Sequence, residues 1–265
     1  MGNINTSKIS NLYYEEHGSG HPLLLIAGLA SDSQSWLPVT EKLSRHFRVI
    51  VFDNWGTGRS PLDNNGITIS RMADDCINLI YHLGLSSVSL LGHSMGGMIA
   101  MEIAARRSNP VDKLILAATT PKISQRNAEL FTDWAAYPDK GLSKRLWFRN
   151  IFYWIFSPAF FENKALLDEA TRLAIDYPFP QPDSSFKNQV NAVIEFDGTG
   201  ILKNINVPAL IMNGEYDLLF QHSGSSDPFA AITNHNSVTV PEAAHSIHTE
   251  KPDEFTKEVV QFLNT

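Results

Sequence analysis

The chain has 265 residues, of which 43% are hydrophobic and 18% are charged, and its formal net charge is −7. This composition is typical of an ordinary globular protein and excludes a disordered one, and the length suits one α/β domain with an insertion. The acidic balance argues against nucleic acid as a partner, because neutralising phosphates requires surplus Lys and Arg.

The N-terminal region predicts the first strands of a sheet. Leu12–Glu16 and Leu23–Ile26 are short apolar-rich runs separated by the turn residues Gly18-Ser19-Gly20, which favours an antiparallel hairpin. The first residues contain no apolar secretory core, so a cytoplasmic location is expected. No run approaches the roughly 18 apolar residues that a membrane span needs.

Short strand-like runs and helical patterns then alternate. The strand-like runs are Val49–Phe52, Val88–Leu91, Leu114–Ala117, Ala209–Met212 and Ser237–Val240. Helical patterns occupy residues 69–83, 98–106 and 255–263, and the first places Cys76 on its apolar face. As the single cysteine, Cys76 excludes an intramolecular disulfide and a cysteine-rich zinc site. The alternation predicts an α/β fold with a doubly wound, mostly parallel sheet.

The alternation stops after Thr120. From residue 121 to about 196 the sequence is aromatic and helical in character, and Val207-Pro208 resumes the sheet pattern. We therefore predict a core made of residues 1–120 and 201–265, with a helical cap of residues 121–200 inserted between two strands.

The stretch Gly92-His93-Ser94-Met95-Gly96 carries the G-x-S-x-G pattern between a strand end and a helix start. A sharp strand-to-helix turn leaves little room around the serine, and glycines supply that room because they lack Cβ. The turn raises the Ser94 hydroxyl above the sheet, near a helix N-terminus where negative charge is favoured. Ser94 is therefore the candidate nucleophile.

A serine hydroxyl is a weak nucleophile, so a base and an orienting acid should follow it in the order serine, acid, histidine. Asp217 and His245 each follow a predicted strand, which places them at the same edge of the sheet as Ser94. We expect His245 to take the Ser94 proton and Asp217 to orient the imidazole.

Three neighbouring residues compete for these roles. His248 could be the base if its loop runs differently, and Glu215 could replace Asp217 as the acid. His93 precedes the nucleophile, but adjacent residues on a tight turn point in different directions. His93 is therefore expected to pack or to border the substrate rather than to catalyse.

Two backbone N–H groups should stabilise the negative oxygen that forms during acyl transfer. One belongs to Met95, directly after the nucleophile, and the other to Leu29, where Gly28 permits close approach of the backbone. This chemistry implies no metal and no organic cofactor.

These motifs resemble the α/β-hydrolase superfamily across nearly the whole chain, and its small capped esterases and enol-lactone hydrolases in particular. The matching pieces are Ala27-Gly28-Leu29, Asp53–Ser60, Gly92–Gly97, Gly214–Asp217 and Ala244-His245 followed by Glu250-Lys251-Pro252. The resemblance implies the α/β-hydrolase fold, a triad of Ser94, Asp217 and His245, and Leu29 and Met95 as backbone donors.

Two positions depart from the family pattern. The family usually has His where this chain has Ala27, and Arg where it has Trp55. The segment Asp53–Ser60 could be mistaken for a nucleotide-binding loop, but it lacks the Lys of a P-loop and the third Gly of a dinucleotide fingerprint. We expect a tight turn after a strand there.

Aromatic residues gather in the predicted cap. Most should pack the cap on the body, and some should line an apolar pocket for the acyl group. The candidate pocket residues are Trp55, His93, Trp134, Trp147, Phe152 and Trp154. Their character favours an apolar or aromatic acyl group over a sugar or a polar acid.

We therefore expect a serine hydrolase that cleaves small-molecule carboxylic esters through an acyl-enzyme. Enol-lactone or C–C bond hydrolysis and cofactor-free haloperoxidase chemistry remain open on the same triad, as does a non-catalytic ligand receptor. The four cations Lys140, Lys144, Arg145 and Arg149 could dock an acyl-carrier protein whose methyl ester is cleaved. A solvated helix face explains these cations better, so a carrier protein is not the expected partner. The oligomeric state is not predicted.

Overall fold

The computed structural model describes residues 5–9, 12–61, 66–137, 141, 143–221 and 227–265. Within them the backbone forms an eight-stranded sheet in the order β1-β2-β4-β3-β5-β6-β7-β8. The strands are β1 (Asn5–Ile9), β2 (Leu12–His17), β3 (Pro22–Ile26), β4 (Arg48–Phe52), β5 (Val88–His93), β6 (Val111–Ala117), β7 (Ala209–Gly214) and β8 (His235–Val240). All pairs from β4 to β8 are parallel, which confirms the predicted doubly wound, mostly parallel sheet.

The predicted hairpin between β2 and β3 is wrong. β4 lies between these two strands, antiparallel to β2 and parallel to β3. The run Leu23–Ile26 of β3 is fully buried on both faces, so it needs a neighbouring strand on each side and helices above and below. A place in the middle of the sheet provides this, whereas β2 has a mixed burial pattern that suits a position near the edge.

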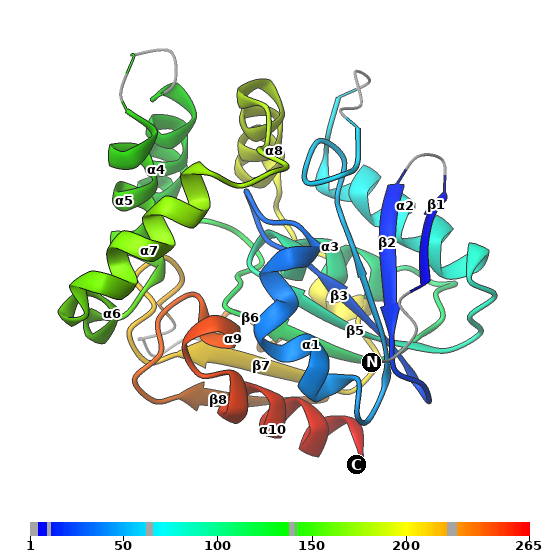
Figure 1. Ribbon diagram of the computed structural model, residues 1–265. Helices are drawn as coiled ribbons and strands as arrows, with labels where there is room; N and C mark the ends of the chain where they lie inside the picture. Colours follow the sequence, from blue (N-terminus) through cyan, green and yellow to red (C-terminus); the bar gives the residue numbers. More distant parts are fainter. Residues whose placement is uncertain (1–4, 10–11, 62–65, 138–140, 142, 222–226) are drawn as a thin grey trace.

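Helices cover both faces of the sheet (Figure 1). One face carries α1 (Leu37–Leu43), α9 (Ile247–Glu250) and α10 (Pro252–Leu263), and the other carries α2 (Ile69–His82) and α3 (Met95–Ala104). The sequence did not predict α1, which follows a 3₁₀ turn at Ser33–Trp36 whose Gln34 amide is capped by the Asp32 side chain. α3 begins at Met95, earlier than the predicted helix at residue 98, and so starts directly after Ser94.

Among the described residues, five α-helices lie between β6 and β7, which confirms the predicted helical insertion. They are α4 (Gln125–Ala136), α5 (Lys144–Ile155), α6 (Pro158–Glu162), α7 (Lys164–Ile175) and α8 (Asp183–Glu195). The two ends of this insertion meet at its base, where the Gly198 amide donates to the Pro121 carbonyl at 2.8 Å and Lys122 pairs with Asp197 at 2.6 Å. The division into core and cap domains itself stays a prediction, with which this arrangement agrees.

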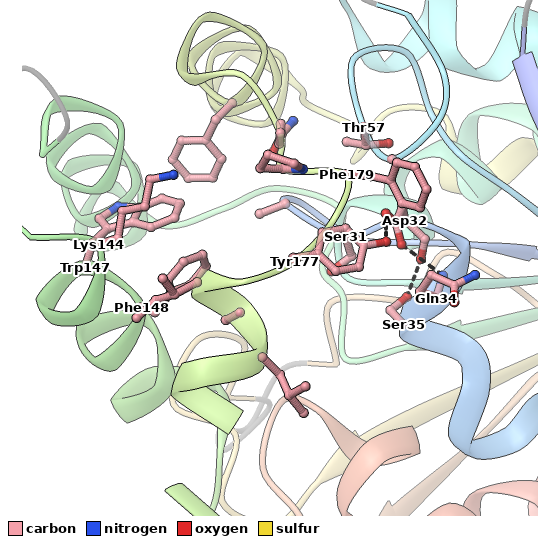
Figure 2. A pocket seen from close by; sticks show the side chains of 18 of the residues that line it. Ser31, Asp32, Gln34, Ser35, Thr57, Lys144, Trp147, Phe148, Tyr177 and Phe179 are labelled. Atoms are coloured by element: carbon pink, nitrogen blue, oxygen red, sulfur yellow. Dashed lines mark hydrogen bonds between the residues drawn. The ribbon is translucent and has the colours of Figure 1, made fainter. Parts of the chain in front are cut away.

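A cavity of about 560 Å³ lies between the cap and the core. Figure 2 shows Trp147 and Phe148 of α5 on one side of it and Ser31, Asp32 and Ser35 of the core on the other. The segment that joins α7 to α8 contributes Tyr177 and Phe179, and the loop after β4 contributes Thr57 and Gly58. Aromatic rings therefore face a polar wall across the cavity.

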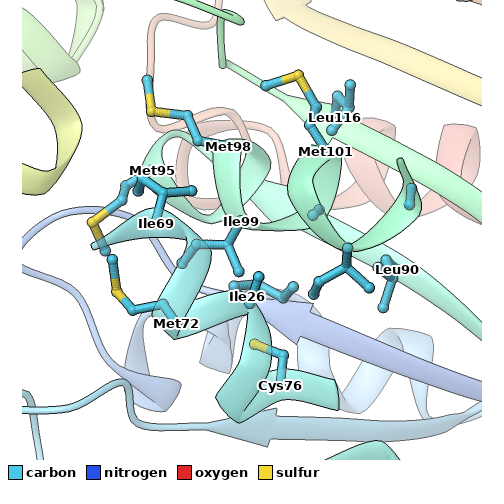
Figure 3. Packing of buried hydrophobic residues seen from close by; sticks show 14 of the residues in the cluster. Ile26, Ile69, Met72, Cys76, Leu90, Met95, Met98, Ile99, Met101 and Leu116 are labelled. Carbon is cyan, nitrogen blue, oxygen red and sulfur yellow. The ribbon is translucent and has the colours of Figure 1, made fainter. Parts of the chain in front are cut away.

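The core below Ser94 lies between α2, α3 and the sheet (Figure 3). Met72 and Cys76 of α2 pack with Met95 and Ile99 of α3 over the buried strand residues. Cys76 is fully buried, and burial raises the pKa of its thiol well above the ordinary value. In the described part of the chain, no helix is long and apolar enough to span a membrane.

Candidate active site

Ser94 occupies a strained turn between the end of β5 and the start of α3. Its backbone angles, φ 55° and ψ −120°, lie in a region that residues with a side chain rarely adopt. Hydrogen bonds hold it there: the Ser94 amide donates to the Ala117 carbonyl at 2.9 Å, and its carbonyl accepts from the Gly97 amide and the Thr119 hydroxyl. The strain therefore persists because the neighbouring strand and helix fix the turn.

Two glycines make this turn sterically feasible. A Cβ on Gly92 would collide with the Gly96 carbonyl, and one on Gly96 would collide with the Ile26 carbonyl of β3. The first turn of α3 therefore lies directly against the ends of β3 and β5, closer than any residue with a side chain allows.

Asp217 follows β7 and His245 follows β8, and their side chains meet. The Nδ1 atom of His245 lies 2.9 Å from Oδ2 of Asp217, and both residues are buried. Because a carboxylate can only accept, Nδ1 carries the proton and Nε2 is left free to accept one. Burial by itself would raise the pKa of Asp217, but the charge and hydrogen bond of His245, with the amides of Leu219 and Phe220, lower it below the ordinary value.

The loop that carries His245 is anchored through its backbone on three sides. The Ala244 amide donates to Glu250 at 2.8 Å, and the Ser246 amide donates to the Ile155 carbonyl of the cap at 2.9 Å. The Nε2 atom of His93 lies 2.9 Å from the His245 carbonyl oxygen. Because a carbonyl can only accept, this Nε2 carries the proton. His93 thus contacts the backbone of the His245 loop.

The other candidates for base and acid, His248 and Glu215, have different partners. The ring of His248 packs against Trp36 and His93. Burial, and secondarily the nearby His245, lowers the pKa of His248 to about 3, although a hydrogen bond to the Ser35 backbone acts in the opposite direction. Glu215 is exposed and accepts from the Glu242 amide. The structure therefore brings Asp217, and not Glu215, to His245, and it leaves His248 as a neutral packing group.

The loop after β3 lies next to the serine. A Cβ on Gly28 would stand 3.1 Å from Cβ of Ser94, so the two backbones are in contact. The Ser31 amide donates to the Gly28 carbonyl at 3.3 Å, which closes a tight turn. Within the described residues, neither the Leu29 nor the Met95 amide donates to a protein acceptor, so both N–H groups are available to a ligand.

The predicted pocket residues are dispersed. Trp147 lines the cavity, where its indole also donates to the Trp134 carbonyl at 2.9 Å. Trp134 is buried and donates to Asn150, Phe152 belongs to an aromatic cluster within the cap, and Trp154 lies beside Arg126. Trp55 packs against the main core, and its buried Nε1 has no partner among the described residues. None of Ser94, Asp217 and His245 is among the lining residues of the cavity.

The polar wall of the cavity was not foreseen. Asp32 is 6% exposed, accepts from the Gln34 amide and accepts from the Tyr177 hydroxyl at 2.5 Å. Burial, and secondarily the adjacent Asp53, raises the pKa of Asp32 despite those hydrogen bonds. The sequence signal for Asp32 was its place before a helical turn, which marks an N-cap, but nothing in the sequence pairs it with Tyr177.

Asp53 organises the turn after β4. Its carboxylate accepts from the amides of Ser33 and Arg59, and Arg59 also pairs with it through Nε at 3.2 Å. In the described residues, no group of three or more His, Cys, Asp or Glu side chains is arranged to hold a metal ion.

Comparison with known proteins identifies the fold independently. A family model described as the alpha/beta hydrolase fold matches residues 21–252. A protein from Azorhizobium caulinodans named "Putative carbamate hydrolase RutD" is 29% identical, and the match covers 96% of this chain and 95% of that protein.

Two solved structures are similar over nearly their full length. An esterase from Thermogutta terrifontis is 25% identical with a TM-score of 0.85, and the match covers 98% of each chain. An enol-lactonase from Burkholderia xenovorans LB400 is 24% identical with a TM-score of 0.86, and the match covers 98% of this chain and 100% of that chain. The second likeness concerns the fold alone.

The strain at Ser94 gives a prediction about stability. Because glycine adopts φ 55° without the penalty that a Cβ brings, Ser94→Gly should be more stable than Ser94→Ala by about 1 kcal/mol in urea unfolding. The pair Cys76→Gly and Cys76→Ala, in the regular interior of α2, should show the opposite order by about 1 kcal/mol. Equal stability of the two Ser94 variants would contradict the strain.

The buried His248 gives a prediction about pH. The unfolded chain binds a proton near the ordinary histidine pKa of 6.5, whereas folded His248 binds it only near a pKa of about 3. The free energy of unfolding should therefore fall as the pH drops from 6.5 towards 4, and His248→Phe should reduce that slope by about 1 kcal/mol per pH unit. Urea titrations at several pH values measure this, with the exposed His46→Phe as control. An unchanged slope in His248→Phe would refute it.

Proposed function

The chain belongs to the alpha/beta hydrolase fold family, and we propose that it is a serine hydrolase that cleaves carboxylic esters through an acyl-enzyme. The observation that carries this proposal is the hydrogen bond between Asp217 and His245 beside the strained turn of Ser94. A buried carboxylate that fixes the imidazole tautomer is the arrangement a serine needs in order to become nucleophilic.

In the proposed reaction, His245 accepts the Ser94 proton at Nε2 while Oγ attacks the ester carbonyl carbon. The Leu29 and Met95 amides donate to the oxygen that becomes negative. The C–O bond to the alcohol then breaks, and His245 returns the proton to the leaving oxygen. A water molecule, deprotonated by His245, then attacks the acyl carbon. The bond between that carbon and Ser94 Oγ breaks, His245 returns the proton to Oγ, and the acid is released. Asp217 stabilises the imidazolium in both halves.

We propose that the acyl group is apolar or aromatic and extends into the cavity under the cap. The cavity reaches the loop after β3 at Ala30, two residues beyond Gly28, which contacts Ser94. Its cap side carries Trp147, Phe148 and Phe186, rings that favour apolar and aromatic groups. The cap, residues 121–200, is accordingly proposed as the specificity domain on the core of residues 1–120 and 201–265.

A carrier-linked substrate receives less support. Arg145 pairs with Asp168 at 2.9 Å, and Arg149 lies 3.9 Å from the same carboxylate, so these cations are partly neutralised within the cap. Lys144 lines the cavity, and Lys140 lies outside the described residues.

Carbamate hydrolysis is the second candidate, because the Azorhizobium relative carries that name. The same triad can attack a carbamate carbonyl, but the carbamoyl-enzyme is expected to hydrolyse slowly. Turnover of matched p-nitrophenyl esters and carbamates separates the two reactions, and a dihydrofuranone enol-lactone tests lactone hydrolysis.

Fluorophosphonate labelling tests the proposed function. We expect wild-type protein to be labelled and Ser94→Ala to be unlabelled, with turnover of p-nitrophenyl esters reduced by at least about 10⁴-fold in the variant. Absence of labelling and of turnover in wild type would support a non-catalytic receptor and reject the serine mechanism.

The pocket gives a separate prediction. Trp147→Ala should lower kcat/KM for benzoate and octanoate esters by about 10-fold, since about 1–2 kcal/mol of apolar contact is lost, and should change acetate by less than about 3-fold. Tyr153→Ala, on the same helix but exposed and outside the cavity, is the matched control. Equal losses on all three esters would contradict acyl binding at Trp147.

A further inference from the structure

The turn after β3 holds a residue in a conformation that needs external support. Ala30 has φ 58°, in the left-handed region that disfavours residues with a Cβ. Ala27, directly before Gly28, is buried, and its methyl side chain cannot form a hydrogen bond. The Ala30 amide finds its acceptor in another part of the chain.

A helix of the cap supplies it. Gln189 of α8 is fully buried, and its Oε1 atom accepts from the Ala30 amide at 3.4 Å and from Nε2 of Gln181 at 3.0 Å. A backbone N–H can only donate, so the carboxamide faces the Ala30 amide with its oxygen. Ser185, one helical turn earlier, donates to the Gly56 carbonyl at 2.8 Å and docks the same helix on the core.

The Nε2 atom of Gln189 indicates that a glutamine is not the most stable choice at this position. This Nε2 atom is buried and has no partner among the described residues. A buried N–H without an acceptor lowers stability, and an apolar residue of the same shape would avoid that cost. The hydrogen bond from the Ala30 amide to Oε1 therefore explains why a glutamine occupies this position.

The Ala30 amide is one peptide away from the proposed oxyanion donor. The Gly28 carbonyl accepts from the Ser31 amide inside the turn, and in a trans peptide the N–H points opposite to the carbonyl. The Leu29 N–H therefore points out of the turn. The following peptide is held at both ends, because the Leu29 carbonyl accepts from the Ser31 hydroxyl at 3.4 Å and the Ala30 amide donates to Gln189.

We propose that Gln189 is a positioning residue, through which the cap holds the Leu29 N–H in place for the oxyanion. The inference rests on the proposed function, since it assumes that Leu29 is an oxyanion donor. In this chain the oxyanion hole is completed by the cap rather than by the core alone.

Gln189→Met tests the inference, because methionine keeps the length of the side chain and loses the acceptor. We expect kcat for p-nitrophenyl esters to fall about 10- to 100-fold with KM changed by less than about 3-fold, since a displaced donor affects the transition state more than binding. Hydrogen exchange of the peptide containing residues 27–36 should become faster. Ser185→Ala, which removes the hydrogen bond of α8 to the Gly56 carbonyl, should change neither the kcat nor this exchange.

Other outcomes distinguish the positioning role of Gln189 from the proposed function. Unchanged kcat and exchange in Gln189→Met, or equal effects of Ser185→Ala, would overturn the positioning role and leave only docking of the cap. Restoration of kcat by Gln189→Glu, which keeps an acceptor, would support it. If wild type neither turns over esters nor reacts with a fluorophosphonate, the proposed function fails, and the exchange of residues 27–36 alone then decides whether Gln189 holds the turn.

Discussion

The close contact between the first turn of α3 and the ends of β3 and β5 is the constraint on which the site depends. Because Gly92 and Gly96 carry no Cβ, the helix begins immediately after the strand. Ser94 is thereby held in a backbone conformation that residues with a side chain rarely adopt. The same contact brings the turn at Gly28 against Ser94. Main-chain packing thus fixes Ser94 and the start of the Gly28 turn, whereas the Ala30 amide of that turn is bonded to the Gln189 side chain.

The charges around the site are arranged so that only one ion pair can form at its centre. His93 and His248 are buried next to His245, and burial, together with the histidines beside them, lowers the pKa of both. They stay neutral and therefore add no positive charge beside the imidazolium that the proposed mechanism forms on His245. Asp217, hydrogen-bonded by two backbone amides as well as by His245, remains ionised.

Sequence reasoning succeeded where a local pattern reflects a local constraint. The buried strand runs and the glycines around Ser94 predicted the sheet and the turn, and the order of Asp217 and His245 after successive strands led to the pair that the structure brings together. It failed where an outcome depends on pairing over distance. The place of β4 between β2 and β3, and the contact of Gln189 with Ala30, connect residues whose local sequence carries no sign of each other. Aromatic content likewise located the cap but could not tell Trp147, which lines the cavity, from Trp134, which is buried beside it.

The meeting of Pro121 with Gly198 at the base of the cap has an evolutionary consequence. Because the chain leaves and re-enters the core at hydrogen-bonded neighbours, the helices between them form an insertion whose two ends share one place in the core. Helices in such an insertion can be lengthened, shortened or exchanged without shifting the register of β6 against β7. Descendants of this chain could therefore acquire new substrates by remodelling the insertion while inheriting the nucleophile unchanged, provided that each new insertion again offers an acceptor to the turn at Ala30.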